Sequence, residues 1–258
     1  MKRFRMNVHP IWLRLCFVLV VVGLTGCSTK PVVEGEPQDP LFAADRVLPS
    51  DETEYAADIW DPWEGMNRGI FRFNAQFDKY VFLPAVHGYK FITPDFLQDR
   101  VSDFFGNIKD LTTFINLVLQ LKGDRAMNTL GRLGWNTTVG LVGLFDVASS
   151  LELNKDNEDF GQTLGHYGAG PGPFLVLPIM GPSNVRDTTG LVVDSIPMWL
   201  WDPFVLNGHP QRQIAYYGLR ALDERANVAF RYYQTGSPFE YELVRMLWNT
   251  KREIEIAR

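Results

Sequence analysis

The chain has 258 residues, of which 46% are hydrophobic, 13% aromatic and 21% charged. This composition is too apolar for an intrinsically disordered chain and too mixed for a protein with many membrane spans. Without the first 26 residues, which carry four basic and no acidic side chains, the net charge falls from −5 to −9, and a chain that acidic is not expected to bind the phosphates of nucleic acids.

The first element is a predicted bacterial lipoprotein signal peptide over residues 1–26. A basic region precedes the apolar run Leu15–Leu24, which is ten residues long, whereas a membrane-spanning helix needs about 20. The run ends in Leu24-Thr25-Gly26-Cys27, which resembles a lipobox, so we expect cleavage before Cys27 and acylation of its thiol. Removal of Cys16 with the signal leaves one cysteine and therefore no internal disulfide.

The residue after the lipidated cysteine indicates the membrane. Lipoproteins that stay in the inner membrane commonly carry an aspartate at this position. This chain has Ser28 there, which indicates the outer membrane.

The next segment, residues 27–58, is predicted to be a tether that follows the lipidated cysteine. Residues 28–58 contain four prolines and eight acidic residues, with Phe42 and Tyr55 as their only aromatics. Such a segment cannot bury a core of its own. We therefore expect one helical domain over residues 59–258.

Helix-start signals and helical spacing dominate this domain. Asp61-Pro62-Trp63-Glu64 and Thr93-Pro94-Asp95 are typical helix starts, and Ser237-Pro238-Phe239-Glu240 is a capping box for a last helix that runs to about Ile256. Apolar residues recur at helical spacing in two stretches. They are Trp63, Met66, Ile70, Phe73, Phe77 and Val81 in the first, and Ala215, Leu219, Leu222, Ala226, Ala229 and Tyr233 in the second. Because alternation with period two is nearly absent, the fold class is predicted to be mainly α with no substantial sheet.

Residues 111–151 are poor in charge, with five charged side chains in 41 residues. The uncharged runs Leu111–Leu121 and Val139–Phe145 are each too short to span a bilayer. They are consistent with a buried helical hairpin, or with a hairpin whose outer face meets lipid. The sequence leaves both interpretations open.

Residues 161–181 are rich in glycine and proline, which excludes a regular helix through their centre. A phosphate-binding loop is disfavoured because Pro171 and Pro173 remove backbone donors and no Gly-Lys-Ser/Thr follows. A specially shaped structural loop is the preferred interpretation.

No motif in the sequence carries catalytic or metal-binding chemistry. The three histidines after the signal, His87, His166 and His209, stand in unrelated contexts without metal-ligand spacing, and there is no Gly-x-Ser-x-Gly. We therefore predict a protein that is not an enzyme and that needs no cofactor and no metal.

Several motifs together resemble the MlaA/VacJ family of outer-membrane lipoproteins. The resemblance covers residues 60–190 in order and accompanies the lipobox. Its motifs are DPWEGMNR at 61–68, FFGNI at 104–108, GLVGLFDVA at 140–148, and EDFGQTLGHYG at 158–168 followed by GPGP at 170–173. Met66 departs from the phenylalanine usual in the family but stays apolar.

The resemblance implies a ring-like helical body that lies in the periplasmic leaflet of the outer membrane. An amphipathic channel through the ring would remove mislocalised phospholipids from the outer leaflet. The implied partners are phospholipid, a trimeric porin of the outer membrane, and a soluble periplasmic lipid carrier that delivers to an inner-membrane ABC transporter.

Two groups of candidate residues follow from this resemblance. Candidates for the pore or its loop are His166, Tyr167, Arg186, Asp187, Gly165, Gly168, Gly170 and Gly172, although an Arg186–Asp187 structural pair is an equal interpretation. Candidates for an apolar rim that meets lipid are Leu117, Leu119, Leu141, Leu144 and Phe145. The alternatives to a channel are a scaffold lipoprotein that docks porins and a carrier, and an enzyme acting on lipids.

Overall fold

The computed structural model describes residues 59–234 and 236–258, all of which belong to the unit Gln38–Arg258. Cys27, the signal peptide and the acidic tether lie outside the described residues, and what we expect of them stays a prediction. The helices and strands in chain order are α3 (Glu64–Phe77), the π-helix η1 (Asp78–Phe82), α4 (Leu83–Ile92), α5 (Asp95–Leu119), α6 (Gly123–Thr138), α7 (Val147–Ser150), α8 (Phe160–His166), β1 (Phe174–Leu177), β2 (Gly181–Asn184), α9 (Val185–Trp201), α10 (Pro210–Ala226) and α11 (Glu240–Ala257).

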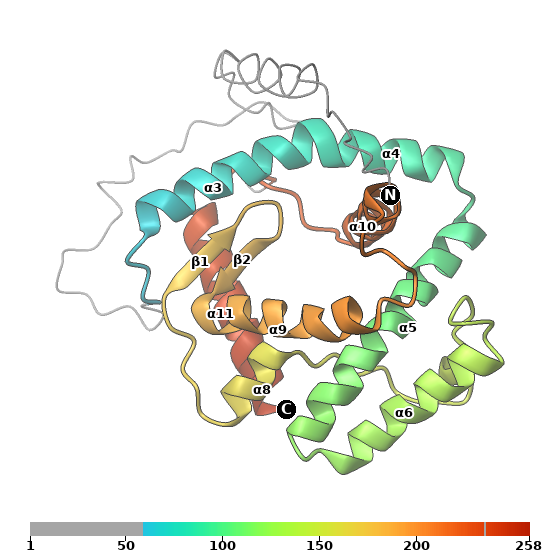
Figure 1. Cartoon of the computed structure of the whole chain (residues 1–258). Helices are drawn as coiled ribbons and strands as arrows, with labels where there is room; N and C mark the ends of the chain where they lie inside the picture. The colour runs from blue at the N-terminus through green and yellow to red at the C-terminus, as the bar shows by residue number, and fades with distance from the viewer. Residues whose placement is uncertain (1–58, 235) are drawn as a thin grey trace, which may run out of the picture. The chain divides into compact units, whose positions relative to one another are not determined.

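The prediction of a mainly α fold without a substantial sheet is confirmed. The strands of the described residues form one antiparallel pair, in which Phe174 lies opposite Asn184 and Leu177 opposite Gly181. Figure 1 shows this hairpin beside α3 and α11, whereas α10 is seen along its axis between α4, α5 and α9.

The first helical stretch runs without a break through α3, η1 and α4. Pro84, at the start of α4, lacks an N–H and crowds the carbonyl of the preceding turn, and the wider π-helical turn lies directly before it. Thr93 then takes an extended conformation before Pro94, as a residue before proline prefers, and α5 begins at Asp95.

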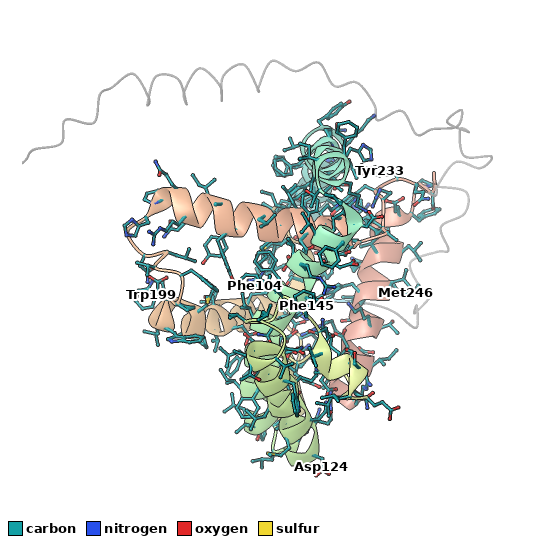
Figure 2. All side chains as sticks on the ribbon, turned by 90° about the vertical axis from the view of Figure 1, so that its right-hand side faces the viewer. Phe104, Asp124, Phe145, Trp199, Tyr233 and Met246 are labelled. Atoms are coloured by element: carbon teal, nitrogen blue, oxygen red, sulfur yellow. The ribbon has the colours of Figure 1, made fainter. Side chains whose placement is uncertain are left out.

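Helices α5 and α6 form an antiparallel hairpin, whose lower end is marked by Asp124 in Figure 2. The turn between them contains Leu121 in a left-handed conformation, with φ of 59°. The prediction that Val139–Phe145 forms the second helical arm of this hairpin is wrong, because α6 ends at Thr138. Leu141, Val142 and Gly143 follow with positive φ, which no α-helix allows.

Three expected helix boundaries also differ from the structure. Asp61 does not cap α3; its carboxylate accepts hydrogen bonds from Asn67 and Tyr241. Ser237 does not cap α11, which begins after Phe239 without a side-chain cap, although the helix extends to Ala257 as expected. The apolar seam predicted to reach Tyr233 is cut short because α10 ends at Ala226.

A small aromatic core joins α3, β1 and α11. Phe71, Phe174 and Tyr241 are buried, and the Phe71 ring meets the edges of Tyr232 and Tyr241 at centroid distances of 5.1 and 5.6 Å. This edge-to-face geometry is the one that aromatic quadrupoles favour. The core therefore holds the C-terminal helix against the first helix of the described chain.

Candidate lipid-facing surface and polar interior

Helix α3 exposes part of its predicted apolar stripe and buries polar side chains beside Phe71 and Ala75. Trp63, Met66 and Phe73, which belong to its predicted apolar stripe, are exposed, whereas Asn67 and Asn74 are buried. In a soluble domain the apolar stripe would face the core. An apolar face that points outward is what a helix in contact with lipid requires.

Large apolar side chains are exposed on several other elements as well. In the α6 region they are Met127, Leu130, Trp135, Val139, Leu141, Val142 and Leu144. On α9 they are Val185, Leu191, Val192, Ile196, Trp199, Leu200 and Trp201. Trp199 and Trp201 are 65% and 68% exposed, and Figure 2 shows Trp199 at the outer end of α9. A contiguous exposed apolar surface marks a membrane or partner interface, and tryptophan is enriched where membrane and water meet.

The interior of the described residues is correspondingly polar. Arg132 on α6 is almost fully buried and binds Asp110 of α5 at 3.2 Å and Asp146 at 2.9 Å. Burial would raise the pKa of Asp146, but hydrogen bonds from Ser149 and Arg132 outweigh it and hold that pKa far below its usual range. Burial of Asp110 dominates instead and raises its pKa. Buried ion pairs of Arg132 therefore join α5, α6 and the segment after α6.

A second ion-pair network joins α8, α9 and α11. Arg252 binds Asp159 and Asp187, each at 2.8 Å, and Asp187 also accepts a hydrogen bond from Arg186 Nε at 2.9 Å. Burial opposes ionisation of Asp159, but its hydrogen bonds with Arg252 and the charge of that residue lower its pKa. Both Arg186 and Asp187 are buried. The structure therefore places them in an ion-pair network, as the alternative interpretation expects, and a role beside a pore stays a prediction.

The glycine-rich segment after α8 is irregular, as its composition indicates. Gly168 and Gly172 have φ of 85° and 67°, in the region that favours glycine. Gly165 packs so closely on Ile256 of α11 that a Cβ would approach its Cδ1 atom to 2.6 Å. His166 and Tyr167 are exposed, and the Tyr167 hydroxyl donates to the carbonyl of Leu119. Gly165, His166, Tyr167, Gly168, Gly170 and Gly172 remain candidates for a pore or its loop.

The candidates for the apolar rim divide into two groups. Leu119, Leu141 and Leu144 are exposed. Leu117 is fully buried, so its prediction as a rim residue is wrong: it lies on the inner face of α5. Phe145 is half-buried and lies 4.6 Å from the Arg100 guanidinium, which covers its ring.

The described part of the chain also bears on membrane-spanning helices and on metal sites. Within residues 59–234 and 236–258, none of the helices combines the length and apolarity needed to cross a membrane. The same residues contain no group of three or more His, Cys, Asp or Glu side chains placed to hold a metal ion.

Comparison with known proteins identifies the family. The family model described as MlaA lipoprotein matches residues 59–255. The chain belongs to the MlaA lipoprotein family. An uncharacterised protein of Rickettsia bellii is 39% identical over 77% of this chain and 78% of its own length. The intermembrane phospholipid transport system lipoprotein MlaA of Haemophilus influenzae is 31% identical over 82% of this chain and 77% of its own length.

A solved structure supports the same membership in the MlaA lipoprotein family. It comes from a study of the structural basis for maintenance of bacterial outer membrane lipid asymmetry. Its TM-score is 0.64 at 27% identity, over 76% of this chain and 98% of the other. The family resemblance expected from the sequence motifs is therefore confirmed, and it extends beyond residue 190 to the C-terminal helix.

Sequence reasoning missed two features of this MlaA family member. One is the aromatic end of α9, where Trp199, Leu200 and Trp201 are consecutive and could have been noticed as an apolar run. The other is the pair of buried asparagines on α3, whose spacing of seven residues places Asn67 and Asn74 on one helix face. That spacing was visible in the sequence, but only the structure shows that the two amides bond to the backbone of β1.

Proposed function

We propose that this chain is an outer-membrane lipoprotein that forms an amphipathic channel for phospholipids. Anchored through Cys27 in the periplasmic leaflet, it removes mislocalised phospholipids from the outer leaflet and maintains lipid asymmetry. The anchor gains about 0.8 kcal/mol for each buried CH₂, so several acyl chains hold it stably.

The observation that carries this proposal is the combination of many exposed apolar side chains with buried polar and charged ones in a member of the MlaA family. Exposed apolar side chains on α3, α6 and α9 suit the acyl-chain region of one leaflet, and each large side chain that lipid covers contributes about 1.5–3 kcal/mol. Polar and charged side chains inside suit lipid head groups. Irregular backbone at membrane depth is tolerated where protein buries it or a watery cavity adjoins it, which fits residues 167–173.

The proposed partners follow from the transport step. Phospholipid is the cargo, a trimeric porin holds the lipoprotein in the outer membrane, and a soluble periplasmic carrier takes the lipid to an inner-membrane ABC transporter. The name of the Haemophilus relative, which places that protein in an intermembrane phospholipid transport system, supports this assignment. The proposal contains no catalytic step and no cofactor.

Outer-leaflet phospholipid in a deletion strain tests the proposed function. Phosphatidylethanolamine that an impermeant amine reagent labels on intact cells should rise in the strain and return to the wild-type level with the full chain. Cys27→Ser should not restore it, because the body loses its anchor. An unchanged outer leaflet in the deletion strain would contradict the proposal.

Cross-linking to lipid separates a channel from a scaffold that only docks a porin and a carrier. A photoreactive amino acid at the exposed Tyr167, in the glycine-rich loop, should capture phospholipid in cells. The same group at Lys251, an exposed position on α11, is the control and should capture little. Capture of protein without lipid at position 167 would favour the scaffold.

A further inference from the structure

Two lysine side chains lie close together along one face of α5. Lys155 reaches from the loop before α8 to Gly106, where a Cβ atom would lie 2.8 Å from its Nζ. Lys109 follows Gly106 by three residues, so it projects from the same face about 4.5 Å further along the helix axis. Both side chains are exposed, and within the described residues neither ammonium group makes a hydrogen bond or an ion pair.

The carboxylates around these lysines are occupied by other partners. Four of them lie close enough for their charges to act on Lys109 or Lys155, and each is paired with an arginine. These pairs are Glu224–Arg220 at 2.8 Å, Asp159–Arg252 at 2.8 Å, Asp110–Arg132 at 3.2 Å and Asp103–Arg100 at 3.0 Å. A fifth, Asp223, accepts hydrogen bonds from Ser102 and Asn227. The positive charges of the two lysines are therefore left without a direct partner.

The environment of Lys109 is partly dehydrated although solvent reaches it. Burial lowers the pKa of Lys109; the charge of Glu224 opposes this effect, and the charges of Arg220 and Lys155 add to it. An ammonium group in this setting gains more from an anion than a fully hydrated lysine does, because it has already lost part of its water.

An aromatic cluster begins on the same face of α5. Phe105 precedes Lys109 by four residues, so the two side chains are neighbours on the helix surface. Its ring meets Tyr216 at a centroid distance of 5.5 Å, and Phe204 meets Tyr216 and Phe104 at 5.5 and 5.6 Å. Figure 2 shows Phe104 in the middle of the described structure, away from the outer end of α9 at Trp199. A cationic group beside an aromatic surface complements a molecule that has an anionic group joined to apolar chains.

We propose that Lys109 and Lys155 bind the phosphate group of a phospholipid, with the adjoining part of its acyl chains against the aromatic rings of Phe104, Phe105, Phe204 and Tyr216. This inference rests on the proposed function and names the cationic contact that the transported lipid makes. Two lysines that bind as point charges accept any phosphodiester, so they select for the phosphate and not for one head group.

Binding of a short-chain phospholipid tests the inference. We would titrate the mature lipoprotein in a non-ionic detergent with dihexanoyl phosphatidylglycerol, and compare wild type with Lys109→Gln/Lys155→Gln. The double variant should bind at least about tenfold more weakly, which corresponds to loss of about 1.4 kcal/mol. Lys251→Gln, an exposed lysine on α11, is the matched control and should bind as wild type does. An unchanged affinity of the double variant would overturn the inference.

Further arms identify the group that is recognised. Dihexanoylglycerol, which lacks the phosphate, should bind wild type and the double variant equally. Inorganic phosphate that binds as tightly as the lipid would show a site for free phosphate and overturn the lipid assignment. Lys109→Arg/Lys155→Arg keeps both charges and should retain binding, so loss of binding in a correctly folded Arg variant would also count against the proposal.

The failure of this inference can be told apart from the failure of the proposed function. If the wild-type chain and Lys109→Gln/Lys155→Gln restore lipid asymmetry equally in the deletion strain, with equal lipid affinity, only the two-lysine site is refuted. If the wild-type chain itself does not restore asymmetry, the transport function is refuted, whatever the affinities.

Discussion

Arg252 illustrates, at the scale of a residue, how a polar interior is stabilised. Its guanidinium contacts the carboxylates of Asp159, the N-cap of α8, and of Asp187 in α9. One of its nitrogens also binds Glu255 at 2.9 Å. Those bonds raise the pKa of Arg252, although its burial acts in the opposite direction. The residue links α11 to α8 and α9, so the C-terminal helix depends on it.

Replacing Arg252 by methionine should therefore be strongly destabilising. The change leaves Asp159 and Asp187 close together without their shared cation, and breaking a buried pair in this way costs about 3–5 kcal/mol. We expect a fall of the thermal unfolding midpoint of many degrees. Lys251→Met, which removes an exposed lysine on the same helix, should change the free energy of unfolding by less than about 0.5 kcal/mol. Equal midpoints for the two variants would contradict the role given to Arg252.

At the scale of an element, α3 takes the place of a third strand. The Asn67 side chain donates to the carbonyl of Phe174 at 3.0 Å and accepts from the N–H of Val176 at 2.9 Å. About two helical turns later, the Asn74 side chain donates to the carbonyl of Leu177 at 2.9 Å and accepts from the N–H of Ile179 at 2.7 Å. A two-stranded hairpin is marginal on its own, and these two amides satisfy the backbone of β1 at its open edge.

The substitution Asn67→Leu tests this element. It would leave a buried carbonyl and a buried N–H of β1 unpaired, each at a cost of about 1–3 kcal/mol. We expect a loss of about 2–4 kcal/mol in the free energy of unfolding, measured by denaturant titration in detergent. The neighbouring Met66→Leu, on the outward face of α3, should be close to neutral. A near-neutral Asn67→Leu would show that β1 does not need the helix.

At the scale of the whole molecule, the tryptophans can test which surfaces meet lipid. Five of those in the described residues are exposed, namely Trp60, Trp63, Trp135, Trp199 and Trp201, whereas Trp248 packs against the aromatic core. An anchor alone would leave the exposed indoles in water. A body that lies within the leaflet would surround them with acyl chains.

Reconstitution into vesicles of phosphatidylethanolamine and phosphatidylglycerol with brominated acyl chains distinguishes these cases. We expect the tryptophan emission to shift to shorter wavelength and to be strongly quenched by the bromine. Trp199→Phe/Trp201→Phe should lose a clear part of that quenching, because it removes two lipid-facing indoles. Trp248→Phe should leave the quenched fraction almost unchanged. Emission that stays unquenched in the wild-type chain would mean that the body stays outside the hydrocarbon.

Much of the architecture could be predicted from local sequence features. The helical spacing of apolar residues predicted helices at α3 and α10, and Thr93-Pro94-Asp95 marked the start of α5. The helix boundaries were less predictable. Asp61 has the chemistry of a cap but accepts a hydrogen bond from Tyr241, and Ser237 accepts from the N–H of Phe239, the residue before α11, and not from within the helix. For Arg186 and Asp187 the sequence left a pore role and a structural pair open. It could not show the bond from Arg252 to Asp187, because Arg252 lies 65 residues further along the chain.

The sequence by itself determined the family, the helical class, and the position of the irregular glycine-rich segment, because these depend on motifs and on backbone preferences that act within a few residues. The tertiary structure alone decided which side of each helix faces inward. An apolar stripe at helical spacing looks the same whether its solvent is a protein core or a lipid leaflet. Only the partners across the fold, the β1 backbone for Asn67 and Asn74 and the carboxylates for Arg132 and Arg252, show that the polar faces of these helices are the buried ones.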